Sequence, residues 1–444
     1  MTLHPKPLAP QERDVRIPHA RVRSLLLFGL LIFVAGIGNG FAQSTDSPSL
    51  SENSSATAQA SASAINWNNG LHIRSRDGKA ELELGGMVQF DDRIFVGPYP
   101  PRKTADFILR RGRVLLLGKG FNRLSFRIMA ESQKNGSMVV RDAYVDFRIK
   151  DELQIEVGKF KSPIGLERLQ AVRNLMFSER ALATDLIPDR DIGIQLHGDL
   201  LGKRLTYMGG IFRGVPDGGS SENRTNHGAD AEFRIFAYPL RDNTTSPLAG
   251  LGFGIGGSAG SEKGTLPSFS TAGLAQFFSY RGGAVADGER TRITPQASYY
   301  WRRMGMMAEY AMSAQDVRLG TVTHRVANTA WQASASYVLT GENASYADVK
   351  PAHAFDPANH HWGAFEVAGR INSLHVDPSA FPLLADPGAS AHNADGFLVG
   401  FNWYPHEYFK VVFNYGHTEF TGGSAAGNRP TENVFISRFQ FSFY

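Results

Sequence analysis

The chain has 444 residues, a formal charge of +4 at neutral pH and no cysteine. The lack of cysteine excludes disulfides, thiol nucleophiles and Cys-ligated zinc, and the small net charge gives no indication of nucleic-acid binding. Beyond the N-terminus, no apolar run approaches the ~20 residues that a membrane-spanning helix requires. Arginine heavily outnumbers lysine, and its guanidinium group keeps its charge and offers a planar set of donors that suits oxyanions.

Residues 1–42 have the pattern of a signal peptide. An arginine-rich start precedes an apolar run over 25–37, and Gly40 and Ala42 supply the small residues of a cleavage site. A stop-transfer anchor is the alternative, but the apolar run is short for one. Residues 43–64 are rich in serine and alanine and have no periodicity, so we expect residues 43–78 to form a flexible leader.

From residue 79 to 444, segments of about ten residues alternate apolar and polar side chains and are separated by glycine-, proline- and aspartate-rich stretches. This pattern predicts an all-β domain, a 16-stranded antiparallel transmembrane β-barrel with short periplasmic turns and long external loops. The long connection 341–359, on the periplasmic side, breaks that rhythm. Aromatic residues near strand ends fit interface girdles, and a soluble β-sandwich is the alternative. The predicted strands are 80–95, 106–118, 121–132, 137–150, 152–159, 191–199, 203–213, 228–239, 248–260, 291–302, 304–315, 326–340, 360–374, 395–405, 408–420 and 431–443.

Patterns typical of catalysis or metal binding are weak in this sequence. The glycines of 252–257 match a dinucleotide-binding template, but no helix follows, so close packing of a strand is the better interpretation. His360 and His361 have no further ligand at metal-binding spacing. We therefore predict no catalytic residue, no metal and no cofactor, and keep a barrel enzyme as the less favoured alternative.

Side-chain parity directs many arginines into the predicted lumen. In the run 107–117 the parity is ambiguous, because one assignment places Arg111 and Arg113 inside and the other places Arg110 there. An arginine on the lipid face costs ~2–4 kcal/mol near mid-bilayer, which favours the assignment with fewer arginines outside. A solvated lumen of mixed charge without an arginine track is the alternative. The other arginines with inward parity are Arg123, Arg127, Arg148, Arg234, Arg292, Arg302 and Arg370.

The connection 160–190 is too long for a hairpin and has apolar residues at helical spacing. We expect it to fold against the barrel wall and narrow the lumen, and to bring Arg173 and Arg180 close to the arginines of the second strand. An external plug or a trimer contact is the competing interpretation. The basic residues that this loop would carry inward are Lys161, Arg168, Arg173 and Arg180.

A series of motifs in order along the barrel resembles the phosphate-selective porin O/P family. It runs through FILRRGRVLLLGKG, RDAYVDF, VGKFKSPIGLERL, FSER, PDRDIGIQLHG, DGERTRITPQASYYW and GFNWYPHEYFKVVFNYGHT to a closing SRFQFSF. The resemblance implies a homotrimer in the outer membrane of a Gram-negative bacterium, with one anion pore per subunit for phosphate or other small anions. The anion-pathway residues carried over by motif are Arg110, Arg111, Arg113, Lys159, Lys161, Arg180 and Arg190.

The sequence departs from the family pattern in two places. Tyr444 follows the phenylalanine that fits the closing strand, and loop 261–290 has a single lysine, Lys263, where a phosphate-selective member would present more. The expected function is thus a passive anion-selective porin for phosphate or related small oxyanions, with a general diffusion porin as the alternative.

Overall fold

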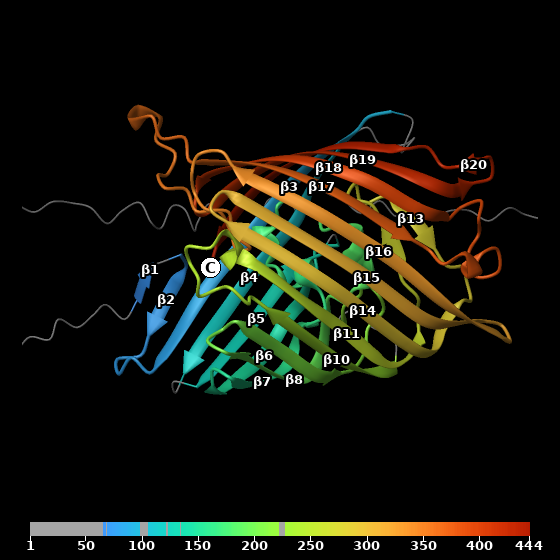
Figure 1. Cartoon of the computed structure of the whole chain (residues 1–444), viewed down its shortest axis with the longest axis horizontal. Helices are drawn as coiled ribbons and strands as arrows, with labels where there is room; N and C mark the ends of the chain where they lie inside the picture. The colour runs from blue at the N-terminus through green and yellow to red at the C-terminus, as the bar shows by residue number, and fades with distance from the viewer. Residues whose placement is uncertain (1–64, 68, 98–104, 121–122, 134, 222–226) are drawn as a thin grey trace, which may run out of the picture. The chain divides into compact units, whose positions relative to one another are not determined.

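The computed structural model describes residues 65–67, 69–97, 105–120, 123–133, 135–221 and 227–444. Sixteen antiparallel strands form a closed barrel, in which the last strand pairs with the first (Figure 1). Each overlaps one of the sixteen predicted strands, so the predicted fold class is confirmed. The barrel strands are β3 (Ala80–Phe95), β4 (Ala105–Gly120), β5 (Leu124–Ser132), β6 (Met138–Lys150), β7 (Leu153–Lys161), β8 (Arg190–Leu200), β9 (Leu205–Phe212), β10 (His227–Ala237), β11 (Leu251–Gly264), β14 (Val285–Trp301), β15 (Met304–Leu319), β16 (Val322–Val338), β17 (Ala364–His375), β18 (Ala391–His406), β19 (Phe409–Ser424) and β21 (Glu432–Phe443).

The remaining elements are short. Two strands precede the barrel, β1 (Ile65–Trp67) and β2 (Leu71–Arg74), and β2 pairs with β3. Within the described residues no helix is long and apolar enough to cross a membrane. The other short elements are α2 (Leu166–Leu169), η1 (Val172–Asn174), η2 (Leu182–Leu186), η4 (Pro247–Gly250), β12 (Ser268–Ser270), β13 (Gln276–Ser279), η5 (Pro357–Asn359), η6 (Pro378–Ala380) and β20 (Gly427–Asn428).

The predicted signal peptide, 1–42, lies outside the described residues, as does the predicted leader up to residue 64. From residue 65 that leader contains β1 and β2, which pair with each other and continue the sheet from β3. The sequence predicted no strand here, because three- and four-residue strands are too short to show a period of two.

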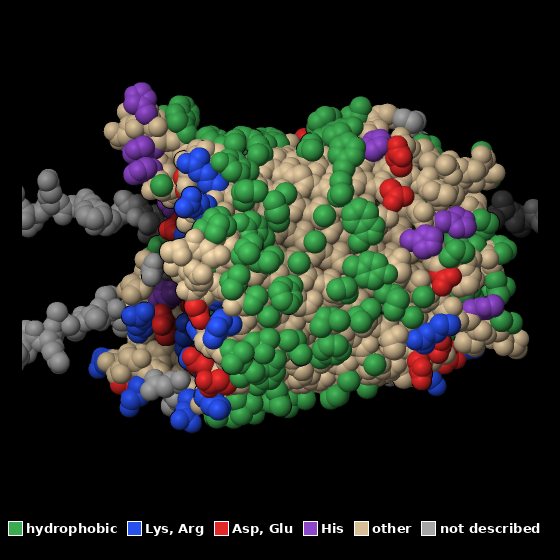
Figure 2. All heavy atoms as spheres, in the orientation of Figure 1, with side chains coloured by type: hydrophobic (Ala, Val, Ile, Leu, Met, Phe, Trp, Pro, Cys, Tyr) green, Lys and Arg blue, Asp and Glu red, His purple; other side chains and the backbone are tan. Residues whose placement is uncertain are grey.

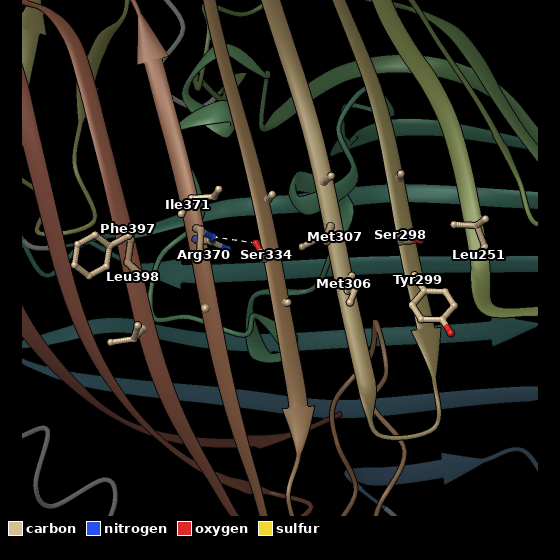
Figure 3. Close-up of a pocket in the computed structure, with 16 residues that line it drawn as sticks. Leu251, Ser298, Tyr299, Met306, Met307, Ser334, Arg370, Ile371, Phe397 and Leu398 are labelled. Atoms are coloured by element: carbon tan, nitrogen blue, oxygen red, sulfur yellow. Dashed lines mark hydrogen bonds between the residues drawn. The ribbon is translucent and has the colours of Figure 1, made fainter. Parts of the chain in front are cut away.

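The barrel wall has an apolar outer face and a polar inner face. Along β16, Trp331 is exposed and the next residue, Gln332, is buried, and this alternation repeats through the strand. Figure 2 shows apolar side chains over the outer face between two charged rims. A hollow of about 610 Å³ lies on this face over β14–β18. Figure 3 shows its rim residues Tyr299, Met306, Ile371 and Phe397.

The connections alternate between two ends of the barrel. We call the end with Tyr444 and the β14–β15 turn the terminal end, and the opposite end the loop end (Figure 1). The connections 162–189, 265–284 and 376–390 start from the loop end. Connection 339–363 starts from the terminal end, which confirms the predicted exception to the rhythm of short turns there.

Candidate functional site

The connection 162–189, hereafter the inner loop, folds into the lumen along the inner wall. Its start lies on β14, where Thr294 Oγ1 donates to the Ile164 carbonyl over 2.9 Å. Its middle lies on β18 and β19, where Asn402 Nδ2 donates to the Met176 carbonyl (2.9 Å) and Lys410 Nζ to the Leu175 carbonyl (2.8 Å). The predicted inward fold is confirmed, and the alternative of an external plug is wrong.

Apolar burial attaches the inner loop to the wall. Val172 and Leu175 pack with Met87 of β3, and Phe177 packs with Ala368 of β17 and Leu398 of β18. The apolar spacing predicted a helix, but the loop forms only single helical turns, since its backbone groups bond instead to side chains of the wall. Each buried large apolar side chain contributes about 1.5–3 kcal/mol, so the loop is held firmly.

A close approach between backbones is needed where the loop leaves β7. At Gly256 of β11, a Cβ atom would lie 2.3 Å from the Ile164 carbonyl oxygen, a distance that no side chain could occupy. The glycine-rich run 252–257 thus lies in a barrel strand, and Gly256 leaves room for the inner loop. This confirms the interpretation of the run as close packing of a strand.

The inner loop faces a stretch of wall formed by β4–β8, which we call the open wall. A cavity of about 240 Å³ lies between them on the side of the terminal end, next to Tyr444. Four basic side chains line it against two carboxylates: Arg113, Arg127, Lys161 and Arg190 against Asp142 and Glu156. The cavity is therefore polar and predominantly cationic.

One carboxylate of the inner loop is surrounded by four guanidinium groups, and we call this group the Glu179 cluster. Glu179 Oε1 accepts from Arg93 Nη2 (2.7 Å), Arg110 Nε (2.6 Å) and Arg438 Nη2 (3.3 Å). Its Oε2 accepts from Arg110 Nη2 (3.1 Å) and Arg111 Nη2 (3.3 Å). The second carboxylate there, Asp91, pairs with Arg93 and Arg438, so the cluster keeps an excess of positive charge.

A second group, the Asp189 cluster, lies where the inner loop joins β8. Asp189 pairs with Arg190 (3.0 Å), Arg168 (3.8 Å) and Arg141. Arg190 Nε also donates to Asp142 over 2.6 Å. Basic groups exceed carboxylates here as well, and Arg190 connects this cluster to the cavity beside the open wall.

Two carboxylates of the inner loop, Glu179 and Asp189, and the guanidinium of Arg180 have shifted pKa values. Burial opposes ionisation of Glu179, but Arg110, Arg111, Arg93 and Arg438 outweigh it and hold the pKa of Glu179 well below its ordinary value. Arg190 and its neighbours do the same for the pKa of Asp189. Burial, reinforced by Arg168, lowers the pKa of Arg180 to about 10. All three groups are thus charged at neutral pH.

Two β-bulges explain arginines that strict alternation misplaces. Between β3 and β4 the pairing passes from Gln89↔Arg111 to Phe90↔Leu109, which leaves Arg110 as the extra residue. Arg110, Arg111 and Arg113 therefore all point inward, whereas parity had allowed only one of the two sets. A bulge between β5 and β6 leaves Arg141 as the extra residue of β6, whereas strict alternation would place it on the same outer face as Val139, Val145 and Phe147.

The other predicted residues fall into three regions. Arg127 lines the cavity and pairs with Asp142 (3.0 Å), and Lys159 is buried in the open wall and donates to the Val140 carbonyl. Arg234 is buried on β10, donates to Gln296 and stacks over Phe236. Arg123 and Arg148 lie exposed at the rim of the terminal end.

Three of the predicted positions differ from the structure. Arg173 lies over the ring of Tyr444, 4.2 Å from its centroid, rather than against β4. Arg180 donates to the carbonyls of Glu167 and Gln170, and its strongest charged neighbour is Arg168 of the inner loop. Arg302 lies in the β14–β15 turn with a positive φ, not in a strand facing the lumen.

Sequence reasoning missed Arg93, Arg438 and Glu179 of the Glu179 cluster. The alternation of polar and apolar residues could have placed the two arginines in the lumen. Arg93 has the same parity as Gln89 and Asp91 in β3, and Arg438 has the same parity as Gln440 in β21. Glu179 gave no such signal, since a loop residue has no parity.

Two further connections enter the lumen. Loop 265–284 packs Phe269, Phe277 and Phe278 against η2 from the loop end, and Arg93 donates to its Ala272 carbonyl (2.6 Å). Connection 339–363 reaches the inner loop from the terminal end, where Tyr346 donates to the Leu166 carbonyl over 2.6 Å. Together with the inner loop, these segments fill much of the lumen outside the open wall.

Comparison with known proteins agrees with this architecture. The outer membrane channel DcaP of Acinetobacter baumannii superposes with a TM-score of 0.56 at 10% identity, over 84% of this chain and 99% of that one. OmpT of Vibrio cholerae superposes with a TM-score of 0.52 at 12% identity, over 84% of this chain and 99% of that one. OprB of Pseudomonas putida superposes with a TM-score of 0.52 at 10% identity, over 83% of this chain and 95% of that one. At such identities the likeness concerns the fold. No relative of similar sequence was found among curated proteins.

Comparison of the sequence with protein families identifies the family of this chain as well as its fold. The model described as phosphate-selective porin O and P matches residues 82–443, which span all sixteen barrel strands. The chain belongs to the phosphate-selective porin O and P family and is an outer-membrane β-barrel channel.

Proposed function

We propose that this outer-membrane channel is passive and anion-selective, and that phosphate or related small oxyanions are its permeant ions. The observation that carries the proposal is the cavity between the inner loop and the open wall, which Arg113, Arg127, Lys161 and Arg190 line. Fixed positive charge in a narrow, low-dielectric passage concentrates anions and excludes cations.

The proposed mechanism is a series of weak sites. An oxyanion exchanges part of its hydration shell for charge-assisted bonds from guanidinium groups. Two clusters and the cavity offer such donors in succession, so the ion can pass from one set to the next instead of staying at one. The anion-pathway residues we propose are Arg110, Arg111, Arg113, Arg123, Arg127, Arg148, Lys159, Lys161, Arg173, Arg180, Arg190 and Arg234.

A general anion pore without phosphate specificity is the second candidate. It is favoured by loop 261–290, whose one lysine, Lys263, lies 3.9 Å from the carboxylate of Asp287 at the loop end. An enzyme is disfavoured, since the family and the fold are those of channels. By family resemblance we also propose a homotrimer. From the sequence pattern we propose export by a signal peptide at residues 1–42, followed by a Ser/Ala-rich leader over 43–78 that ends in β1 and β2.

Planar-bilayer recording tests the proposal. Under a potassium chloride gradient the reversal potential should show that chloride permeates better than potassium, and cation preference would refute anion selectivity. Added phosphate should inhibit the chloride current if phosphate binds in the pore. Anion preference without phosphate inhibition would favour the general anion pore.

A further inference from the structure

The Glu179 cluster has the geometry of an occupied oxyanion site. Four guanidinium groups from β3, β4 and β21 converge on one carboxylate, and both of its oxygens accept charge-assisted bonds. Such bonds are the ones that arginine makes with carboxylate and phosphate ligands alike. The carboxylate comes from the inner loop, whereas the donors come from the barrel wall, so the loop supplies the ligand and the wall supplies the site.

The cluster is partly exposed at Arg110 and buried at its other three arginines. The side chain of Arg110 is 24% exposed and that of Glu179 10% exposed, whereas Arg93 and Arg438 are only 2% exposed. An anion that reaches the cluster would therefore meet Arg110 first. It would compete with Glu179 for the Nε and Nη2 donors of this residue.

We propose that Glu179 is a built-in anion that competes with permeating ions for the guanidinium groups of its cluster. This inference rests on the proposed function and names what regulates the affinity of that pathway. The cluster can bind an ion from solution only while Glu179 is displaced from the arginines. The apparent dissociation constant is therefore the intrinsic one divided by the fraction of time that the cluster is free of Glu179. Competition by Glu179 thus lowers the apparent affinity of four converging arginines and lets an anion leave, which conduction requires.

A merely structural role for Glu179 makes a different prediction. Another carboxylate of the loop, Glu167, pairs with Arg370 of β17 and accepts from the Ala181 amide over 2.8 Å. Glu167 attaches the loop to β17, which carries none of the four arginines of the cluster. Removing its charge changes the net charge of the loop by the same amount. Glu167→Gln is therefore a matched control for both net charge and loop attachment.

The test uses the purified full-length porin in planar bilayers with potassium chloride and inorganic phosphate as probes. Glu179→Gln keeps the shape of the side chain and removes its charge. We expect about a tenfold fall in the half-saturating chloride concentration and in the half-inhibitory phosphate concentration, since the tethered competitor is gone. Glu179→Asp keeps the charge on a shorter side chain, so its half-saturating chloride and half-inhibitory phosphate concentrations should lie between those of the wild type and Glu179→Gln.

The salt dependence separates competition from general electrostatics. Near 1 M salt the Debye length falls to about 3 Å, so the fields of charges that are exposed to the pore are screened. Glu167 is buried and pairs with Arg370 rather than with the cluster, so Glu167→Gln should change phosphate inhibition much less than Glu179→Gln at every salt concentration. The effect of Glu179→Gln on phosphate inhibition should persist, because it concerns occupancy of the site.

Three outcomes would overturn the inference. The first is unchanged chloride saturation and phosphate inhibition in Glu179→Gln. The second is an effect of Glu167→Gln on phosphate inhibition at high salt that equals the effect of Glu179→Gln. The third is a larger conductance with lower anion selectivity in Glu179→Gln, which would mean that the substitution loosens the inner loop. A wild-type channel that prefers cations would refute the proposed function as well. An anion-selective wild type with an unresponsive Glu179→Gln variant would refute this inference alone.

Discussion

Arg110 and Arg111 are consecutive residues of β4, yet both donate to the carboxylate of Glu179. Consecutive residues of a regular strand point to opposite faces, so this convergence requires the bulge opposite Gln89 and Phe90. Without the bulge one of the two guanidinium groups would face lipid, at a cost of ~2–4 kcal/mol near mid-bilayer.

The first prediction concerns selectivity. Neutralising Arg111 and Arg180 together, as Arg111→Gln with Arg180→Gln, should lower the chloride-to-potassium permeability ratio severalfold, because both guanidinium groups lie inside the barrel and bond to the inner loop, which lines the proposed path. Arg302→Gln should change that ratio little, since this exposed turn residue stacks beside Trp301 at the terminal end. Reversal potentials of the wild type and of both variants measure the ratio. Equal losses of selectivity in the double and single variants would contradict the assignment of Arg111 and Arg180 to the anion pathway.

The sixteen strands could be predicted because each carries an apolar outer face, and a membrane enforces that alternation along the whole chain. The same rule failed at Arg110 and Arg141, since one extra residue in a strand reverses the parity of every later residue in that strand and leaves no mark in the pattern. The inward fold of the inner loop could be predicted from its apolar residues, which need a surface to cover.

The insertion of connections 265–284 and 339–363 into the lumen could not be predicted. Contacts such as Arg93 with Ala272 and Tyr346 with Leu166 join residues 179 and 180 positions apart. These contacts depend on the closed barrel bringing its walls together, and neither segment carries a periodicity that would indicate its partner. The central position of Glu179 was hidden for the same reason.

The second prediction concerns stability. Asp91 is fully buried and accepts from Arg438 Nε (2.6 Å), Arg438 Nη2 (2.8 Å) and Arg93 Nη2 (2.7 Å). Asp91→Asn should lower the free energy of unfolding by about 3–5 kcal/mol. It leaves the buried Arg93 and Arg438 with only Glu179 as a counter-charge, which they share with Arg110 and Arg111. Denaturant unfolding in detergent measures this loss. Asp287→Asn, which removes a carboxylate from the rim, is the control and should leave the midpoint nearly unchanged.

The third prediction concerns the contact between the start of the inner loop and β11. Gly256→Ala places a methyl group against the Ile164 carbonyl, so the start of the loop must shift inward from β11 or the strand must move. We expect a stability loss of about 1–3 kcal/mol from overpacking, together with an altered single-channel conductance. Gly369→Ala is the matched control, since a Cβ there meets nothing within 4 Å. Wild-type conductance in the Gly256 variant would mean that the loop does not depend on this contact.

The fourth prediction concerns pH. Asp185 lies in η2 of the inner loop, where its Oδ2 accepts from the Ser270 amide over 3.3 Å. Burial raises the pKa of Asp185 to about 7, against the opposing effects of Arg168 and of the Ser270 bond. A carboxyl with a raised folded-state pKa opposes folding once the pH exceeds its unfolded value, and the penalty grows until the pH passes the folded-state pKa. The contact between η2 and loop 265–284 should therefore loosen as the pH rises from 5 to 8.

Amide hydrogen exchange at residues 182–187 and 268–279, corrected for intrinsic rates, should accelerate over this range in the wild type. Asp185→Asn keeps an acceptor for the Ser270 amide without the titration, so its protection should be independent of pH. The same pH dependence in both proteins would show that another group loosens this contact.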